Sequence, residues 1–309
     1  MTPKKKAFRI LVMLALVGCS VYLSCVLYCA LQRNLTFAKR KTTWQFLQQQ
    51  LEQKVKAFPG EAGIIIKDLD MGWEIAFNPE KKFPSASLAK IPIMAACYAA
   101  QSEGKLRLTD VIKLQKAYRT GGSGVLKNAP VGTELSIEEL LEHMIGDSDN
   151  TATNIFITKL GYPYLNDYFK RLGLEQTNLV RKMMDFSRRK QGVENYTSAR
   201  DMARILEMFY WHSGPAKDYA EPALRLLKLQ RYNDRIPAKL PYYVTVLHKT
   251  GLENRVCHDV GIVYTAKGNF IISVLTGGLT QSKQAKEFIS RVSLDVYNYF
   301  FDLVKPRGF

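Results

Sequence analysis

Ser87 and Lys90 are a serine and a lysine three positions apart, and Pro84 and Ser85 just before them are typical of a helix start. The i,i+3 spacing places the hydroxyl and the amine on one helical face, one turn apart. A serine in the first turn of a helix has a backbone N–H that is free of intrahelical hydrogen bonds and can hold an oxyanion. A lysine whose pKa is lowered by burial or by a second cation can take the serine proton. The pair therefore predicts nucleophilic catalysis through Ser87.

The Ser-x-x-Lys pattern alone is weak evidence, because it occurs by chance roughly once or twice in a chain of this length. Ser102 and Lys105 have the same spacing. We discard this second pair because Gly104 is typical of the end of a helix, so its two side chains need not share a face.

A second candidate motif is Ser148-Asp149-Asn150, which follows an apolar helix and precedes another helix start. In an extended or turn backbone, residues two apart point the same way. Ser148 and Asn150 would then face a cleft together while Asp149 points back into the protein. The competing interpretation is simple N-capping by Asp149 or Asn150, which is the commoner use of these residue types.

A third candidate motif is Lys249-Thr250-Gly251, at the end of a strand with alternating hydrophobicity. A cation and a hydroxyl at a strand edge suit a substrate carboxylate, and Gly251 lets another backbone approach closely. The alternative is an edge-strand lysine followed by a turn. The near-copy 119–121 lies in a glycine-rich stretch, and we interpret it as a loop.

Hydrophobic periodicity predicts the elements that must position these motifs. A helix over 43–58 precedes two strands, a block of helices follows, and three strands and a helix end the chain. We therefore expect an α/β (α+β) fold: a five-stranded, mostly antiparallel sheet flanked by helices, with an inserted all-α lobe over about 85–235. A site is expected in the cleft between the sheet and the lobe. The predicted strands are 63–68, 73–77, 243–250, 256–264 and 269–276, and the predicted helices of the lobe and C-terminus are 87–101, 136–144, 151–160, 164–172, 198–211, 222–229 and 282–301.

The composition is that of a globular protein, since 47% of the 309 residues are hydrophobic and 23% are charged. It excludes a wholly disordered chain, a collagen-like fibre and a small disulfide scaffold. The formal net charge is +16. Half of this excess lies in the first 41 residues, so we expect no nucleic-acid partner but a basic segment near an anionic surface.

Residues 10–31 form an uncharged, mostly apolar run that is long enough to cross a bilayer core of about 30 Å. We expect a cytoplasmic N-terminus over 1–9, a transmembrane signal-anchor over 10–31, a linker over 32–43 and a folded domain over 44–309. This places the protein in the cytoplasmic membrane with its domain on the extracytoplasmic side. The alternatives are a cleaved signal peptide and a lipoprotein attached through Cys19.

The cysteines and histidines give no sign of a metal or cofactor site. Beyond the apolar run only Cys97 and Cys257 remain, and two buried thiols are expected rather than a bridge. The four histidines are scattered along the sequence. No metal and no cofactor are therefore predicted.

The three motifs occur in the order that is typical of class A β-lactamases and penicillin-binding proteins, and the chain resembles this family over about residues 44–305. The segments 83–90, 144–154, 248–251 and 258–263 carry the likeness. The resemblance implies a five-stranded antiparallel sheet with a helical lobe, and acyl transfer through a serine ester. The implied substrates are β-lactams or peptidoglycan-type peptides that end like D-Ala-D-Ala, and we expect a monomer.

Transferred position by position, the resemblance makes Ser87 the nucleophile and Lys90 the candidate base for acylation. Ser148 passes a proton to the leaving nitrogen. The backbone N–H groups of Ser87 and Leu252 form the oxyanion hole. Lys249 lies close enough to Lys90 for the two amines to lower each other's pKa.

The resemblance also assigns the residues that bind substrate. Asn150 hydrogen-bonds a side-chain amide of the substrate, and Lys249 and Thr250 hold its carboxylate. Gly251 belongs to the same substrate-binding strand.

One position departs from the family pattern. Class A β-lactamases carry a glutamate shortly after an arginine in the loop that follows the second motif, and it activates the water that cleaves the acyl-enzyme. If Arg181 is the matching arginine, Met183 takes the glutamate's place; Asp185 or Glu194 can substitute only if the loop folds differently. We therefore expect a membrane-anchored serine hydrolase with slow deacylation. The alternatives are a non-hydrolytic penicillin-binding sensor or binding domain of the cell envelope, and a structural envelope domain without chemistry.

Overall fold

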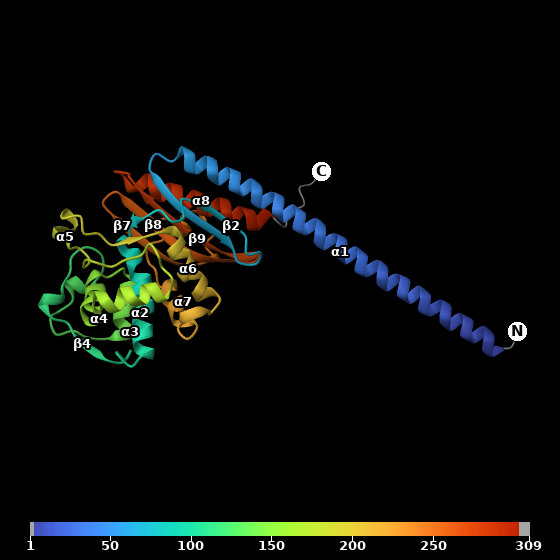
Figure 1. Cartoon of the computed structure of the whole chain (residues 1–309), viewed down its shortest axis with the longest axis horizontal. Coiled ribbons are helices and arrows are strands. Elements are labelled where there is room, and N and C mark those ends of the chain that lie inside the picture. The colour runs from blue at the N-terminus through green and yellow to red at the C-terminus, as the bar shows by residue number, and fades with distance from the viewer. Residues whose placement is uncertain (1–2, 303–309) are drawn as a thin grey trace. The chain divides into compact units, whose positions relative to one another are not determined.

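The computed structural model describes residues 3–302, which belong to two units with a boundary between Gln50 and Leu51. The helix α1 (Pro3–Ala57), the blue ribbon in Figure 1, includes the residues on both sides of this boundary. The segment 32–43, which was expected to be a linker, is helical. The helix predicted over 43–58 is therefore the C-terminal part of α1 and does not begin at residue 43. From Leu16 onward, α1 is long and apolar enough to cross a membrane, a test that a signal sequence also passes.

A five-stranded antiparallel sheet organises the second unit, in the strand order β2-β1-β9-β8-β7. Two strands from the start of the domain thus pair with three from its end, as predicted (Figure 1). The consecutive residues Ile64, Ile65 and Ile66 are all fully buried, because both faces of the central strands are covered. The strands are β1 (Glu61–Asp68), β2 (Glu74–Phe77), β7 (Thr245–Glu253), β8 (Val256–Thr265) and β9 (Gly268–Gly277).

Helices cover the two faces of the sheet. On one face α8 (Ser282–Asp302) lies along β8 and β9, and the rings of Phe270 and Phe300 stack 5.2 Å apart between their centroids. On the other face lies α6 (Ala199–Tyr210), where Glu207 pairs with Lys67 of β1 at 2.5 Å (Figure 1). This helix lies inside the range expected for the helical lobe but packs on the sheet.

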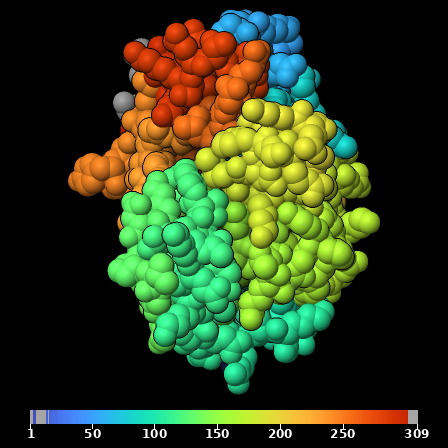
Figure 2. Space-filling view, turned by 90° about the vertical axis from the view of Figure 1, so that its left-hand side faces the viewer, coloured from blue at the N-terminus to red at the C-terminus, as the bar shows by residue number. Residues whose placement is uncertain are grey.

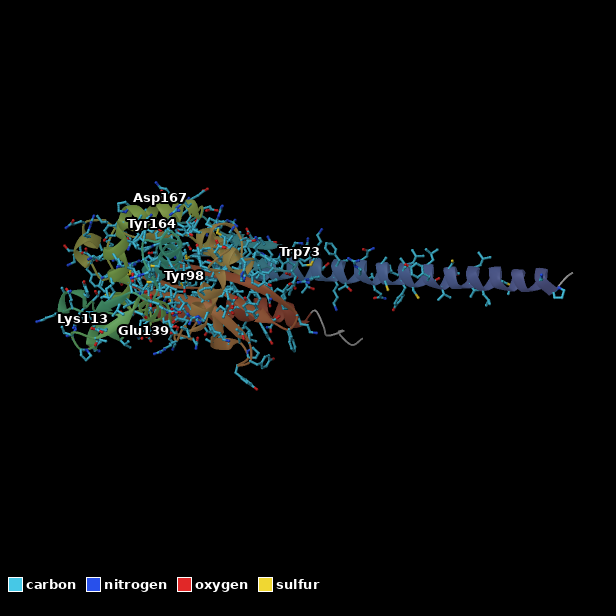
Figure 3. The ribbon with its side chains drawn as sticks, turned by 90° about the horizontal axis from the view of Figure 1, so that it is seen from below. Trp73, Tyr98, Lys113, Glu139, Tyr164 and Asp167 are labelled. Carbon is cyan, nitrogen blue, oxygen red and sulfur yellow. The ribbon has the colours of Figure 1, made fainter. Side chains whose placement is uncertain are left out.

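The helical lobe is inserted between β2 and β7, and Tyr98 stacks on Tyr219 in its interior at a centroid distance of 5.6 Å. Figure 3 shows Tyr98 within the lobe and Asp167 at its edge. The two helices predicted over 151–160 and 164–172 form the bent helix α4, which Gly161 interrupts with φ 77° and ψ 153°. The lobe contains α2 (Lys90–Ser102), α3 (Ile137–Gly146), α4 (Asn150–Arg171) and α7 (Ala220–Lys228).

Several short elements were not predicted, because they are too short to show a hydrophobic period. Four of them form two small antiparallel strand pairs, 83–84 with 196–197 and 111–113 with 134–136. The short elements are β3 (Phe83–Pro84), β4 (Val111–Lys113), β5 (Glu134–Ser136), β6 (Tyr196–Thr197), α5 (Phe186–Lys190) and the 3₁₀ turns η1 (Ala86–Ala89), η2 (Lys116–Tyr118), η3 (Leu126–Asn128), η4 (Gly214–Ala216) and η5 (Ile236–Lys239).

Candidate active site

Ser87 lies in the 3₁₀ turn η1, so the α-helix expected to include it begins only at Lys90. In a 3₁₀ turn, side chains three apart eclipse, which brings Lys90 directly over Ser87. The Lys90 Nζ is 3.0 Å from the Ser87 Oγ. Ala86, just before the serine, has φ 45°, in the left-handed region that non-glycine residues avoid. Backbone strain of this kind is typical of functional sites.

The fully buried amine of Lys90 has a hydrogen-bond environment that suits a base. Its Nζ donates to the Ser148 carbonyl oxygen at 2.7 Å and to the Asn150 Oδ1 at 2.8 Å. The Asn150 Nδ2 donates to the Gly121 carbonyl at 3.0 Å, which fixes the amide with its oxygen toward Lys90. A neutral amine has two N–H groups, so these two acceptors leave its lone pair for the Ser87 hydroxyl.

Burial lowers the pKa of Lys90 from 10.5 to about 7, although the carboxylate of Asp149 partly opposes this shift. The sequence predicted a lowered pKa for Lys90 and left its cause open between burial and a second cation. The structure makes burial the largest cause. At neutral pH a large share of Lys90 is therefore unprotonated.

The second motif combines both interpretations that its sequence allowed. Asp149 is the N-cap of α4, where its side chain accepts from the Ala152 N–H at 3.0 Å, and it also accepts from the Leu126 N–H at 2.8 Å. Ser148, with φ 54°, and Asn150 both reach Lys90. Capping by Asp149 thus fixes the turn that points its two neighbours into the site.

The third motif lies within β7, which continues to Glu253 instead of ending at Thr250. Lys249 is fully buried although β7 is an edge strand. Its Nζ is 2.9 Å from the Ser148 Oγ, so this hydroxyl lies between the amines of Lys249 and Lys90, the latter at 3.1 Å. Burial lowers the pKa of Lys249 well below its usual value, and the nearby charge of Lys90 lowers it further.

Gly251 lets the nucleophile segment approach β7 closely. A Cβ at this position would lie 3.3 Å from the Leu88 Cγ of η1 and 3.1 Å from the His258 Cδ2. The close neighbours are side chains and not the backbone that the sequence suggested. His258, which the sequence analysis did not single out, donates from Nε2 to the Pro84 carbonyl at 2.9 Å and accepts at Nδ1 from the Thr276 N–H at 3.1 Å. It therefore ties the segment before Ser87 to the sheet.

The glycine-rich stretch 121–124 also belongs to the site, which its sequence did not reveal. The Gly121 carbonyl orients Asn150, and the Ser123 carbonyl accepts from the Asn150 N–H at 3.1 Å. Gly124 has φ 104°, and a Cβ there would lie 2.1 Å from the Asp149 Oδ2, so only glycine fits. The partners are almost thirty residues apart in sequence, which is why no local pattern showed this contact.

Met183 takes a defined position in the loop over 179–195. The Asn154 side chain accepts from the Met183 N–H at 2.8 Å and donates to its carbonyl at 3.1 Å. Asp185 instead caps α5 through the Arg188 N–H at 3.1 Å. Glu194 pairs with Arg181 at 2.7 Å. Met183 lines the pocket of Ser87. The carboxylates of Asp185 and Glu194 are held by the contacts with Arg188 and Arg181.

A pocket of about 320 Å³ contains the Ser87 side of this arrangement. Its walls come from η1, the glycine-rich stretch, the start of α4, the loop over 179–195 and the end of β7, and they include Ser87, Ser123, Asn150, Met183 and Leu252. Figure 2 shows the green, yellow and orange segments that carry these walls meeting on one face of the molecule.

Two of the five cysteines lie beyond the apolar run. Cys97 and Cys257 are buried and unbridged, as predicted. Among residues 3–302 no group of three or more His, Cys, Asp and Glu side chains is placed to hold a metal ion. Catalysis without a metal or cofactor stays a prediction.

A model of the β-lactamase enzyme family matches residues 46–300. The chain belongs to this family. The extended-spectrum β-lactamase PER-1 of Pseudomonas aeruginosa is 24% identical over 286 residues, which cover 86% of this chain and 91% of that relative. This β-lactamase family chain is a serine hydrolase, and acyl transfer is its class of reaction.

Solved structures of family members share the fold. A β-lactamase from Sphaerobacter thermophilus is 29% identical with a TM-score of 0.76, covering 85% of this chain and 99% of its own. The protein PBP-A is 30% identical with a TM-score of 0.76, covering 83% and 96%. A leucine-to-glutamate mutant of PBP-A, with a TM-score of 0.77 and 30% identity over 84% of this chain and 97% of its own, was solved as an acyl-enzyme complex with penicillin G.

Proposed function

We propose that this chain is a membrane-anchored hydrolase that forms an acyl-enzyme at Ser87 with β-lactams or with peptides that end like D-Ala-D-Ala. The observation that carries the proposal is the 3.0 Å contact between the Ser87 Oγ and the Lys90 Nζ. The amine is buried, its pKa is about 7, and two acceptors already occupy its N–H groups. It therefore has the geometry and the basicity to take the serine proton.

In the proposed acylation, the Ser87 Oγ attacks the carbonyl carbon while its proton passes to the Lys90 Nζ. The N–H groups of Ser87 and Leu252 stabilise the oxyanion, and each such donor is typically worth ~10²–10³-fold in rate. The proton then moves from Lys90 through the Ser148 Oγ to the leaving nitrogen. The Ser148 hydroxyl supports this path because it is 3.1 Å from Lys90 and 2.9 Å from Lys249.

The substrate carboxylate would lie against Lys249 and Thr250, and Asn150 would bind a side-chain amide of the substrate. An incoming carboxylate favours the charged form of a lysine, so binding itself would protonate Lys249. Gly251 keeps this strand close to η1, because a side chain there would meet Leu88.

Deacylation would be slow. The thioether of Met183 is a weak hydrogen-bond acceptor and has no basicity with which to activate water. Asp185 and Glu194, the two carboxylates considered as replacements for the glutamate, make other contacts.

The test is to mix the detergent-solubilised protein with excess nitrocefin and to follow both colour and intact mass. We expect one burst of colour, a stable acyl adduct and no adduct on the Ser87→Ala variant. An adduct on the Ser87→Ala variant would contradict the assignment of the nucleophile, and sustained turnover would contradict slow deacylation.

A second candidate function is a penicillin-binding sensor or binding domain of the cell envelope that is acylated without turnover. Met183, which cannot activate water, favours this second function, and so does the N-terminal apolar helix. Stoichiometric labelling that persists for hours would support this function, whereas repeated turnover would exclude it.

For localisation we propose an anchor over residues 10–31 in the cytoplasmic membrane, with the hydrolase domain of a monomer on the extracytoplasmic side. The apolar N-terminal helix supports it. Replacing Cys19 by Ala separates this anchor from the lipoprotein alternative. The anchored form stays in the membrane fraction after the change, whereas a lipoprotein is released.

A further inference from the structure

Two arginines and two glutamates form a closed ring of ion pairs at one wall of the Ser87 pocket. Arg181 contacts Glu194 at 2.7 Å and Glu253 at 3.2 Å. Arg189 contacts the same two carboxylates, Glu194 at 3.0 Å and Glu253 at 2.8 Å. Three members belong to the loop over 179–195, and Glu253 is the last residue of β7, directly after Leu252. The ring thus joins the loop that carries Met183 to the strand that carries the proposed oxyanion donor.

The ring makes the pocket wall electrically neutral. Within residues 3–302, Arg181 and Glu253 are the charged side chains that line this pocket. Their side chains are only 4% and 16% exposed, so solvent screens their charges weakly. Each arginine in the ring meets two carboxylates and each carboxylate meets two arginines, so the ring itself carries no net charge.

The rest of the wall beside the ring is apolar. Met183, Met184 and Phe186 of the loop and Leu252 of β7 line the pocket. Met184, Phe186 and Leu252 are exposed although they are large apolar side chains. Exposed apolar surface that lines a pocket is typical of a binding site for an apolar group.

We propose that Glu253 is a specificity-determining residue, whose carboxylate balances Arg181 and Arg189 and so restricts the pocket to acyl donors with an uncharged, apolar side chain. The inference rests on the proposed function, because it takes the group beside the scissile carbonyl to occupy the pocket of Ser87. Without the carboxylate, two arginines face one glutamate, and the wall carries an excess positive charge that attracts an anionic acyl group.

The matched probes are benzylpenicillin and carbenicillin, which differ by one carboxylate on the acyl side chain. Acylation rates of the full chain in detergent are measured with each probe by quenching and intact mass. We expect the wild type to prefer benzylpenicillin. The Glu253→Gln variant should raise the ratio of the carbenicillin rate to the benzylpenicillin rate about tenfold, through Coulomb attraction in a partly buried site.

Three further variants separate charge from structure. Glu253→Asp keeps the charge and should keep the wild-type ratio. Arg189→Gln removes a positive charge from the same ring and should lower the ratio, opposite to Glu253→Gln. The matched control Glu134→Gln removes an exposed carboxylate that pairs with Lys113 in the β4–β5 hairpin, and should change nothing.

Ratios that move the same way in Glu253→Gln and Arg189→Gln would overturn the proposal, because a purely structural role predicts that result. Unchanged ratios with normal adduct formation would also overturn it, while leaving the acylation of Ser87 intact. If the wild type forms no adduct with either penicillin, the proposed function itself fails, and this inference fails with it.

Discussion

At the scale of single residues, the proposed mechanism depends on the protonation state of Lys90. Burial lowers the pKa of this amine from its ordinary value of 10.5 to about 7. As the pH falls below 7 the ammonium form grows and the lone pair is lost. We therefore expect the acylation rate to fall about tenfold for each pH unit below roughly 6 and to level off above 8. Stopped-time intact mass across pH 5 to 9 measures this profile.

Lys90→Arg tests at constant pH whether acylation needs an unprotonated base at this position, because a guanidinium stays protonated in proteins. We expect it to lower acylation at pH 8 by about 10²–10⁴-fold, which is the usual worth of a general base. Lys105→Arg is the matched control, since Lys105 belongs to the exposed Ser-x-x-Lys pair that we discarded. Equal rates in Lys90→Arg and wild type would remove Lys90 from the mechanism.

In the proposed function, Met183 makes deacylation slow because a thioether has no basicity with which to activate water. Met183→Glu places a carboxylate at a position that Asn154 holds by its backbone, beside Ser87. We expect deacylation to accelerate by about 10²-fold or more, because a general base becomes available to the attacking water. The decay of the isolated adduct measures it. Met184→Glu, one position further, is the control; equal acceleration in both variants would show that any nearby carboxylate suffices.

The sequence predicted the motif residues well because their spacing is local. Ser87, Lys90, Ser148, Asn150 and Lys249 meet as expected. The sequence left the cause of the lowered pKa of Lys90 open between burial and a second cation, and burial is the largest cause. Burial depends on the whole lobe closing over the amine, and no short pattern reports it.

At the scale of elements, His258 of β8 links the sheet to the nucleophile segment. Its two nitrogens bond the Pro84 carbonyl and the Thr276 N–H, and burial lowers its pKa from 6.5 to about 4. Because the unfolded chain binds this proton more readily, the free energy of unfolding should fall as the pH drops from 6.5 to 4, by about 3 kcal/mol. Above pH 6.5 the folded protein loses none of this free energy of unfolding.

His258→Leu should remove this part of the pH dependence and lower the free energy of unfolding at pH 7 by about 2–4 kcal/mol, since two buried backbone groups lose their partner. Urea unfolding followed by near-ultraviolet circular dichroism at pH 7 and pH 4.5 measures both effects. The exposed His212 on the lobe serves as the control through His212→Leu. A His258→Leu variant with the wild-type pH slope would contradict this account.

The long elements were predicted and the short ones were not, for a physical reason. Strands such as β8 and β9 and helices such as α8 show a hydrophobic period of their own. The glycine-rich stretch 121–124 and the ion-pair ring of Glu253 depend on contacts between residues about thirty to seventy positions apart. Their place in the site follows only from the assembled fold.

At the scale of the whole molecule, every residue of the proposed mechanism lies in the second unit, between Ser85 and Glu253. The family match likewise begins at residue 46. We therefore predict that a chain of residues 42–309 is acylated by benzylpenicillin within about twofold of the full-length rate, because the shorter chain keeps every residue of the proposed mechanism. Intact mass of both proteins under identical conditions measures the two rates. A folded 42–309 chain that fails to acylate would mean that the N-terminal helix takes part in the reaction.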